Sequence, residues 1–259
     1  MSDAATLSEA VEAIEEQTDR KETAENIDEK VATAKGTVSN LNGDVEDLAE
    51  AVEILQFYHR LLDEMFGGDE PPGVQSALDE AEAAVQSDKG DIVDALVENT
   101  EGGRGTRINE LRKDVTAATS SVQQATESVK ERLRGYQTEW EEQLSSARDL
   151  QEIIGGQNDQ FAQTVSWLEE IITTNMWSPD RSASTIISNW ENATSQWENH
   201  QDLQGLDAFR ETHGLSDDAV EAVERLSSRS SLTLADVDIE VLRELKDIDQ
   251  LSDAVELSI

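Results

Sequence analysis

Histidine and cysteine are the residues that most often do chemistry near neutral pH, and this sequence has few of them. It has three histidines, His59, His200 and His213, and no cysteine. No two histidines lie within one helical turn, so neither an HExxH nor an HxH metal motif is present. The lack of cysteine excludes thiolate metal ligands, cysteine nucleophiles and disulfides. We therefore predict no catalytic residues, no metal site and no cofactor, and expect that the protein is not an enzyme.

Carboxylates are too abundant to mark a site. Among 259 residues, 57 are Asp or Glu, so paired carboxylates occur throughout and carry no information about acid–base catalysis. The glycine-rich stretch Gly102–Gly105 has no GKS or GKT after it and no strand before it, which favours a plain loop over a phosphate-binding loop. An enzyme with an unrecognised carboxylate site is kept as a third hypothesis for the function.

Tryptophan is the other residue type with functional potential. Four of the five tryptophans lie between positions 167 and 197. Trp177 precedes Ser178 and Pro179 at an expected helix end, so we predict that it is the most exposed and name it as the candidate partner-binding residue. Trp167 and Trp190 are expected nearer the core. The alternatives are an aromatic cage for a cation and a core that contains all five tryptophans.

The element that must position these residues is a heptad repeat from Ile27 to Leu62. With Ile27 at a d position, the seam continues through Val31, Ala34, Val38, Leu41, Val45, Leu48, Val52, Leu55, His59 and Leu62. An apolar period of 3.5 residues keeps one face of a helix turned to a partner helix, which is the chemistry of a coiled coil. His59 occupies an a position, where a polar residue is tolerated or specifies register.

A second, weaker seam follows, and it raises a question of topology. It comprises Ile108, Leu111, Val115, Ala118, Val122, Ala125 and Val129. Valine at a with leucine at d favours a parallel two-stranded homodimer. The second seam lies in the same chain, however, and its effective concentration is far higher than that of another molecule. We therefore predict an all-α fold with a long antiparallel coiled-coil hairpin, and favour a monomeric hairpin over a parallel homodimer.

The predicted hairpin divides the chain into five segments. They are the first long helix (1–66), a small helical end (67–104), the second long helix (105–154), a Trp-rich helical bundle (155–205) and a helical C-terminal appendage (206–259). From Ile54 onward the first helix has apolar residues on every side, so we expect it to be buried in the small helical end. This end is also expected to contain helices at 74–86 and 91–98. The alternation of apolar and polar residues at 231–234 and 255–259 indicates a possible two-strand patch in the appendage.

The charge of the chain is extreme. The formal net charge is −37, and the 20 basic residues are seven Lys and thirteen Arg. In this surplus of acid and shortage of lysine, the sequence resembles acidic coiled-coil proteins of salt-in halophilic archaea. The resemblance implies a fold that needs concentrated salt, because molar salt screens charge repulsion within about 3 Å. An acidic disordered protein is the alternative, against which the regular apolar periodicity argues.

The same charge restricts the partners. Binding to nucleic acid or to a membrane surface requires clusters of Lys and Arg on the protein, and the sequence has none of sufficient length. No apolar run is long enough for a membrane span. The first residues lack the pattern of a signal peptide, so we expect a cytoplasmic protein. We predict a non-enzymatic scaffold or adaptor that binds protein partners in a halophilic cytoplasm. The alternative is an accessory or regulatory subunit of an NTP-driven machine in antiviral defence or chromosome handling, with a large ATPase as partner.

Overall fold

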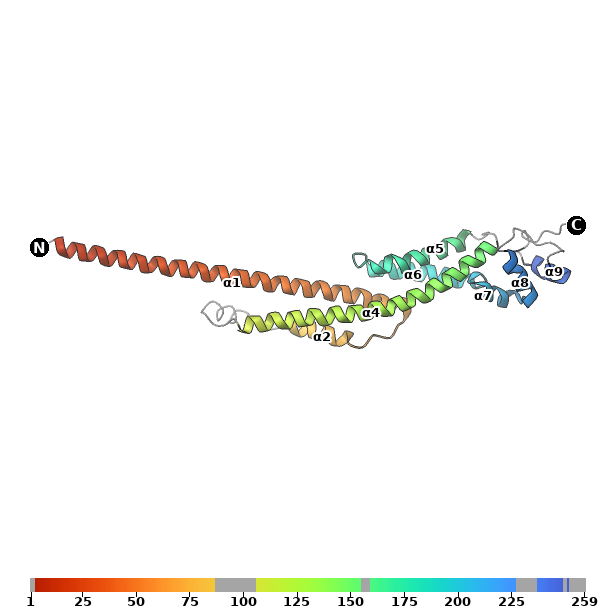
Figure 1. The fold of residues 1–259 in the computed structure, drawn as a ribbon, viewed down its shortest axis with the longest axis horizontal. Helices are drawn as coiled ribbons and strands as arrows, with labels where there is room; N and C mark the ends of the chain where they lie inside the picture. Colours follow the sequence, from red (N-terminus) through yellow and green to blue (C-terminus); the bar gives the residue numbers. More distant parts are fainter. Residues whose placement is uncertain (1–2, 87–105, 155–158, 227–236, 249–250, 252–259) are drawn as a thin grey trace. The chain divides into compact units, whose positions relative to one another are not determined.

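The protein is all-α over the residues that the structure describes. The computed structural model describes residues 3–86, 106–154, 159–226, 237–248 and 251 (Figure 1). Its α-helices are α1 (Asp3–Phe66), α2 (Val74–Val85), α4 (Thr106–Ile153), α5 (Asp159–Thr173), α6 (Ala183–Glu198), α7 (Leu206–His213), α8 (Asp217–Leu226) and α9 (Ile239–Lys246). The predicted all-α class is confirmed. The predicted helix at 91–98 and the predicted strands at 231–234 and 255–259 lie outside the described residues.

Local signals account for the helix ends. Gly67 has a φ of 57°, a left-handed conformation that glycine adopts without strain, and its N–H donates to the carbonyl of Asp63 at 2.9 Å. This bond closes α1 one residue after Phe66. At the start of α8, the hydroxyl of Ser216 accepts a hydrogen bond from the N–H of Ala219 at 3.2 Å, which satisfies a donor that the helix itself leaves free.

The contacts of the chain divide it into two compact units. Unit 1 comprises Met1–Leu55 and Pro72–Thr126, and unit 2 comprises Gln56–Pro71 and Glu127–Ile259. The expectation of a small helical end that packs the residues from Ile54 onward is therefore wrong. The last turns of α1 instead pack in the Trp-rich bundle, where the indole N–H of Trp190 donates to the carbonyl of Met65 at 2.9 Å.

Helices α1 and α4 run in the same direction, so the antiparallel hairpin is also wrong. In unit 2, the ammonium of Lys130 lies 5.0 Å from the ring centroid of Tyr58, and the ring of Phe66 stacks on that of Tyr136 at 4.8 Å. A residue later on α1 thus meets a residue later on α4, which only parallel helices allow. Figure 1 shows the same direction for the parts of α1 and α4 in unit 1.

The parallel direction of α1 and α4 depends on where α4 begins beside α1. Helix α4 begins beside the middle of α1, where Arg112 forms an ion pair with Asp44 at 2.6 Å. Helix α2, which precedes α4 in the sequence, lies in the same unit as this part of α1 and the start of α4 (Figure 1). The prediction of a small helical end at 67–104 had implied that the second long helix runs antiparallel to the first.

The core of unit 1 includes part of the predicted seam. The d residues Leu41, Leu48 and Leu55 are buried. They share the core of the unit with buried residues of α2 and α4, namely Val74, Ala77, Ala81, Ile108, Val115, Ala118, Val122 and Ala125. The a residues Val45 and Val52 are only half-buried, whereas Ala51 at a g position is buried. The buried face of α1 is thus rotated toward d and g, away from the simple a and d pattern.

Unit 2 is built on aromatic side chains. Its cluster contains Phe66, Tyr136, Trp140, Phe161, Trp190 and Trp197, whose neighbouring ring centroids lie 4.8–5.8 Å apart. Offset and edge-to-face pairs at such distances stabilise a core beyond the burial of their area. Helices α5 and α6 are also joined by a hydrogen bond of 3.0 Å from the buried Thr164 hydroxyl to Gln196.

Candidate protein-interaction surface

Part of the coiled-coil seam of α1 is exposed in the part of the chain that the structure describes. We call the four seam residues Ile27, Val31, Ala34 and Val38 the open seam. The exposed fractions are 55% for Ile27 and 46% for both Val31 and Val38, whereas Leu41, the next seam residue, is 8% exposed. Side chains of this kind are normally buried in a coiled coil. The burial of one seam therefore changes abruptly between Val38 and Leu41.

The cause is the position at which α4 begins. Helix α4 starts at Thr106, and Ile108 in its first turn is buried. Because α4 runs parallel to α1 and its Arg112 contacts Asp44, its packed face meets α1 only from about one turn before Asp44 onward. The stretch of α1 that holds the open seam lies before this point. Heptad periodicity alone does not reveal where a partner helix begins, so the sequence does not distinguish the exposed part of the seam from the buried part.

A groove follows the open seam and has a basic flank. It has a volume of about 500 Å³ and is lined by Val31, Ala34, Lys35, Val38, Ser39 and Asn42. Lys30 directly precedes Val31, and Lys35 directly follows Ala34, so one lysine lies at a g position and the other at an e position. Neither lysine forms an ion pair with another described residue. From Lys30 to Gly43 the sequence contains no Asp or Glu, although the chain has 57.

The covered part of the seam has the opposite charge at its flank. Asp44 precedes the a residue Val45, and its carboxylate accepts a hydrogen bond from Nε of Arg112 on α4 at 2.6 Å. This hydrogen bond to Asp44 raises the pKa of Arg112 above its ordinary value. The α1–α4 interface thus combines apolar seam residues with an opposite charge facing a flanking position, as in coiled coils that select their partner by charge.

Trp177 is less exposed than the sequence analysis predicted. It lies in the 3₁₀ turn Asn175–Trp177 and is half-buried. Its indole N–H lies 3.0 Å from both the Ile172 carbonyl and the side-chain oxygen of Gln137, and the guanidinium of Arg134 lies 5.7 Å from its ring centroid. These contacts fix the side chain within unit 2. A role for Trp177 in partner binding stays a prediction.

The exposed tryptophan is Trp167, which the sequence analysis had placed nearer the core. Its side chain on α5 is 42% exposed, whereas Trp190 and Trp197 are each 4% exposed. The neighbours of Trp167 on the outer face of α5 are polar, among them Gln163, Ser166 and Glu170. A single exposed tryptophan among polar residues is a common surface feature and does not form an apolar patch.

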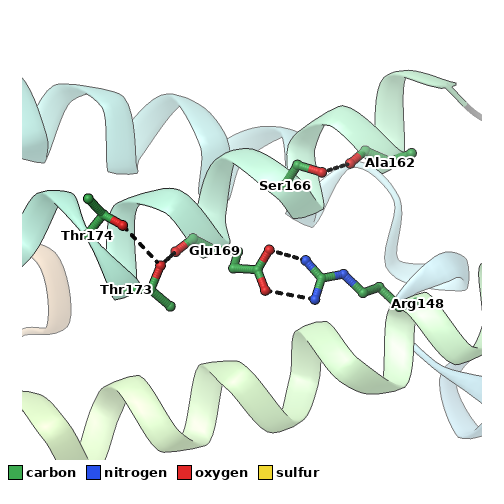
Figure 2. A network of polar contacts seen from close by, with 6 residues as sticks. All are labelled: Arg148, Ala162, Ser166, Glu169, Thr173 and Thr174. Atoms are coloured by element: carbon green, nitrogen blue, oxygen red, sulfur yellow. Dashed lines mark hydrogen bonds and ion pairs between the residues drawn. The ribbon is translucent and has the colours of Figure 1, made fainter.

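An ion pair joins α4 to α5 on the surface of unit 2. Figure 2 shows that the guanidinium of Arg148 faces the carboxylate of Glu169 with two parallel contacts, of which the one from Nη1 to Oε1 measures 2.8 Å. This hydrogen bonding lowers the pKa of Glu169 and raises that of Arg148. Both side chains are more than 40% exposed, so the pair orients α5 on α4 but forms no enclosed site.

The three histidines are distributed over separate surroundings. His59 lies 3.5 Å from Glu70, His213 lies 4.0 Å from Asp202, and Nδ1 of His200 lies 2.9 Å from the carbonyl of Gln196. Within the described residues, no group of three His, Cys, Asp or Glu side chains is placed to hold a metal ion.

Unit 2 also contains a cavity. It has a volume of about 620 Å³ between α4 and the α6–α7 region, and its lining includes Ser146, Asp149, Trp197, Asp207 and Glu224. Three of these residues are carboxylates, and the described lining contains neither a histidine nor a cationic side chain, which disfavours an anionic ligand.

Membrane-spanning helices and known relatives are two further indicators of the type of protein. No helix in the described part of the chain is both long and apolar enough to span a bilayer. A comparison of the sequence and structure with protein-family models, curated proteins and solved structures finds no match.

Proposed function

We propose that the protein is a scaffold or adaptor that binds a protein partner through the open seam of α1. The observation that carries this proposal is the change in burial along one seam, from 46% exposed at Val38 to 8% exposed at Leu41. A helix with exposed seam residues gains free energy when a second helix covers them, at roughly 25 cal/mol for each Å² of apolar area removed from water.

The shape of the surface supports a helix as the ligand. The open seam spans three turns on one face of a continuous helix, with about 16 Å between its first and last residue at 1.5 Å per residue. A helical ligand would extend the packing that α4 provides further along α1. Helix-in-groove recognition of this kind uses apolar anchors at heptad spacing.

A paired set of variants tests the proposal. Val31→Asp places a charge in the open seam, whereas Ala32→Asp places the same charge on the neighbouring exposed position outside it. In pull-downs from the source cells, we expect a protein to be retained by the wild type and by Ala32→Asp but lost with Val31→Asp. Equal thermal midpoints of the three proteins would show that folding is intact. Retention of the same proteins by all three would refute the proposal.

A further inference from the structure

The charges that flank the open seam identify the kind of helix that it binds. We infer that the partner is an amphipathic helix of another protein, with an apolar heptad seam that Asp and Glu flank at its e and g positions. The inference rests on the proposed function, because it specifies the ligand of the same surface. It uses three observations: the α1–α4 interface, the two lysines and the limits on a second copy of this chain.

The α1–α4 interface shows how α1 selects a helix. At the g position Asp44, an acidic residue on α1 meets a basic residue on α4, Arg112, at 2.6 Å. Two heptads earlier, the g position of α1 is Lys30, and the e position Lys35 lies between them on the other flank. Asp28, directly after Ile27, is the other charged e position, so the flanks of the open seam carry two positive charges and one negative charge, whereas Asp44 at the covered part is negative. A helix that continues the same pattern of packing would carry acidic residues opposite Lys30 and Lys35.

A second copy of this chain does not meet this requirement in the parallel direction. In a parallel coiled coil, each g residue faces the following e residue of the partner helix. Two parallel copies in register would set Lys30 of each chain against Lys35 of the other, and like charges at these positions disfavour pairing.

The antiparallel direction is blocked by packing. In an antiparallel dimer, Ile27–Val38 of one copy would pack against Ile27–Val38 of the other. The part of α1 before Ile27 in each copy would then lie along Leu41 and Leu48 of the other copy. Those positions are 8% and 1% exposed, since α4 lies in the same unit and covers this side of α1. A separate helix that ends or turns away where α4 begins meets no such obstacle.

Two synthetic peptides of four heptads can serve as probes. Both have Ile at a and Leu at d; one has Glu at all e and g positions, and the other has Lys there. With fluorescein on each peptide, anisotropy gives its affinity for the full-length protein in concentrated salt, which preserves the helicity of the protein and screens the general attraction of the Lys peptide to the net charge of −37. Acidic residues at both flanks face Lys30 and Lys35 whichever direction the peptide takes.

We expect the Glu peptide to bind with micromolar affinity and at least tenfold more tightly than the Lys peptide. The double variant Lys30→Glu/Lys35→Glu should reverse this order. Lys113→Glu reverses one charge at an exposed position of α4, which is half the change in the double variant, and should leave the order unchanged. Val31→Asp/Val38→Asp should abolish the binding of both peptides, because both need the apolar seam.

Two other outcomes would overturn the inference, and each identifies a different property of the open seam. Equal binding of both peptides, or tighter binding of the Lys peptide, would refute the acidic partner but leave a helix-binding seam in place. A dimer in sedimentation that dissociates with Val31→Asp would identify a second copy as the occupant.

Failure of both peptides would overturn the inference, and thiol labelling then decides whether the proposed function falls with it. The chain has no cysteine, so Val31→Cys in the open seam can be compared with Ala32→Cys beside it, since both positions are exposed in the structure. Protection of the thiol at position 31 alone, in a monomer, would show that the chain itself covers the seam, and the proposed function would fail as well. Equal labelling would mean that the seam is accessible but does not bind an acidic helix.

Discussion

Alanine substitutions at two positions of the same seam should have opposite effects on stability. Leu48 and Val31 both belong to the heptad repeat of α1, but Leu48 is 1% exposed in the core of unit 1 and Val31 is 46% exposed. Leu48→Ala removes buried methyl groups and leaves a cavity, which costs about 2–5 kcal/mol. Val31→Ala removes little buried area, and alanine is the better helix former by up to about 0.7 kcal/mol. We expect no loss of stability at Val31.

Urea and thermal unfolding followed by far-UV circular dichroism would measure both effects. A loss of 2–5 kcal/mol lowers the midpoint of a chain of this size by about 4–20 °C, whereas the midpoint of Val31→Ala should equal or slightly exceed that of the wild type. Val38→Ala, at a second exposed seam position, is the matched control and should behave like Val31→Ala. Comparable losses for Val31→Ala and Leu48→Ala would refute the reasoning, because they would show that the open seam is buried in solution.

Three other predictions follow from unit 2 and from the charge of the chain. Trp190→Phe keeps the aromatic ring but leaves the carbonyl of Met65 without its donor, so it should cost about 1–3 kcal/mol in urea unfolding, and an unchanged midpoint would contradict this hydrogen bond. The Arg148–Glu169 pair should contribute at most about 1 kcal/mol, because both side chains are largely exposed. Since hydrogen bonding to Arg148 lowers the pKa of Glu169 in the folded state, this contribution is complete above the unfolded pKa of about 4.3 and is lost as the pH falls through the lower folded pKa. The difference in unfolding free energy between the wild type and Glu169→Gln should therefore be present at pH 7 and vanish in strong acid; a difference that persists there would contradict the assignment. Finally, the net charge of −37 should make the helicity depend on salt: we expect a loss of far-UV signal on dialysis from molar to 0.1 M KCl, where the screening length rises from about 3 to about 10 Å, and an unchanged signal and thermal midpoint would refute the halophilic interpretation.

The sequence by itself determined the helices of this protein, because their signals are local. The heptads of α1, the glycines after Phe66 and the cap at Ser216 each act within a few residues, and the helices they predict are present. The helix predicted at 74–86 is present as α2, which spans Val74–Val85.

Burial of single tryptophans was harder to predict. Trp190 lies in the core as expected, but the positions expected for Trp167 and Trp177 were wrong in relative exposure. The argument for Trp177 relied on its place at a helix end, where exposure is common. The contacts that hold it come from Gln137 and Arg134 on α4, far away in sequence. No local pattern around Trp177 contains this information.

Only the tertiary structure decided the direction of α4 and the extent of the covered seam. Two apolar seams in one chain can pack parallel or antiparallel, because a heptad pattern reads almost the same in both directions. The choice depends on where the second helix begins, and α4 begins beside the middle of α1. The seam residues before Leu41 are therefore exposed, although their types and spacing match those of the buried ones. The pattern defines a face that can pack against a helix, and the position of α4 determines which part of that face is buried in unit 1.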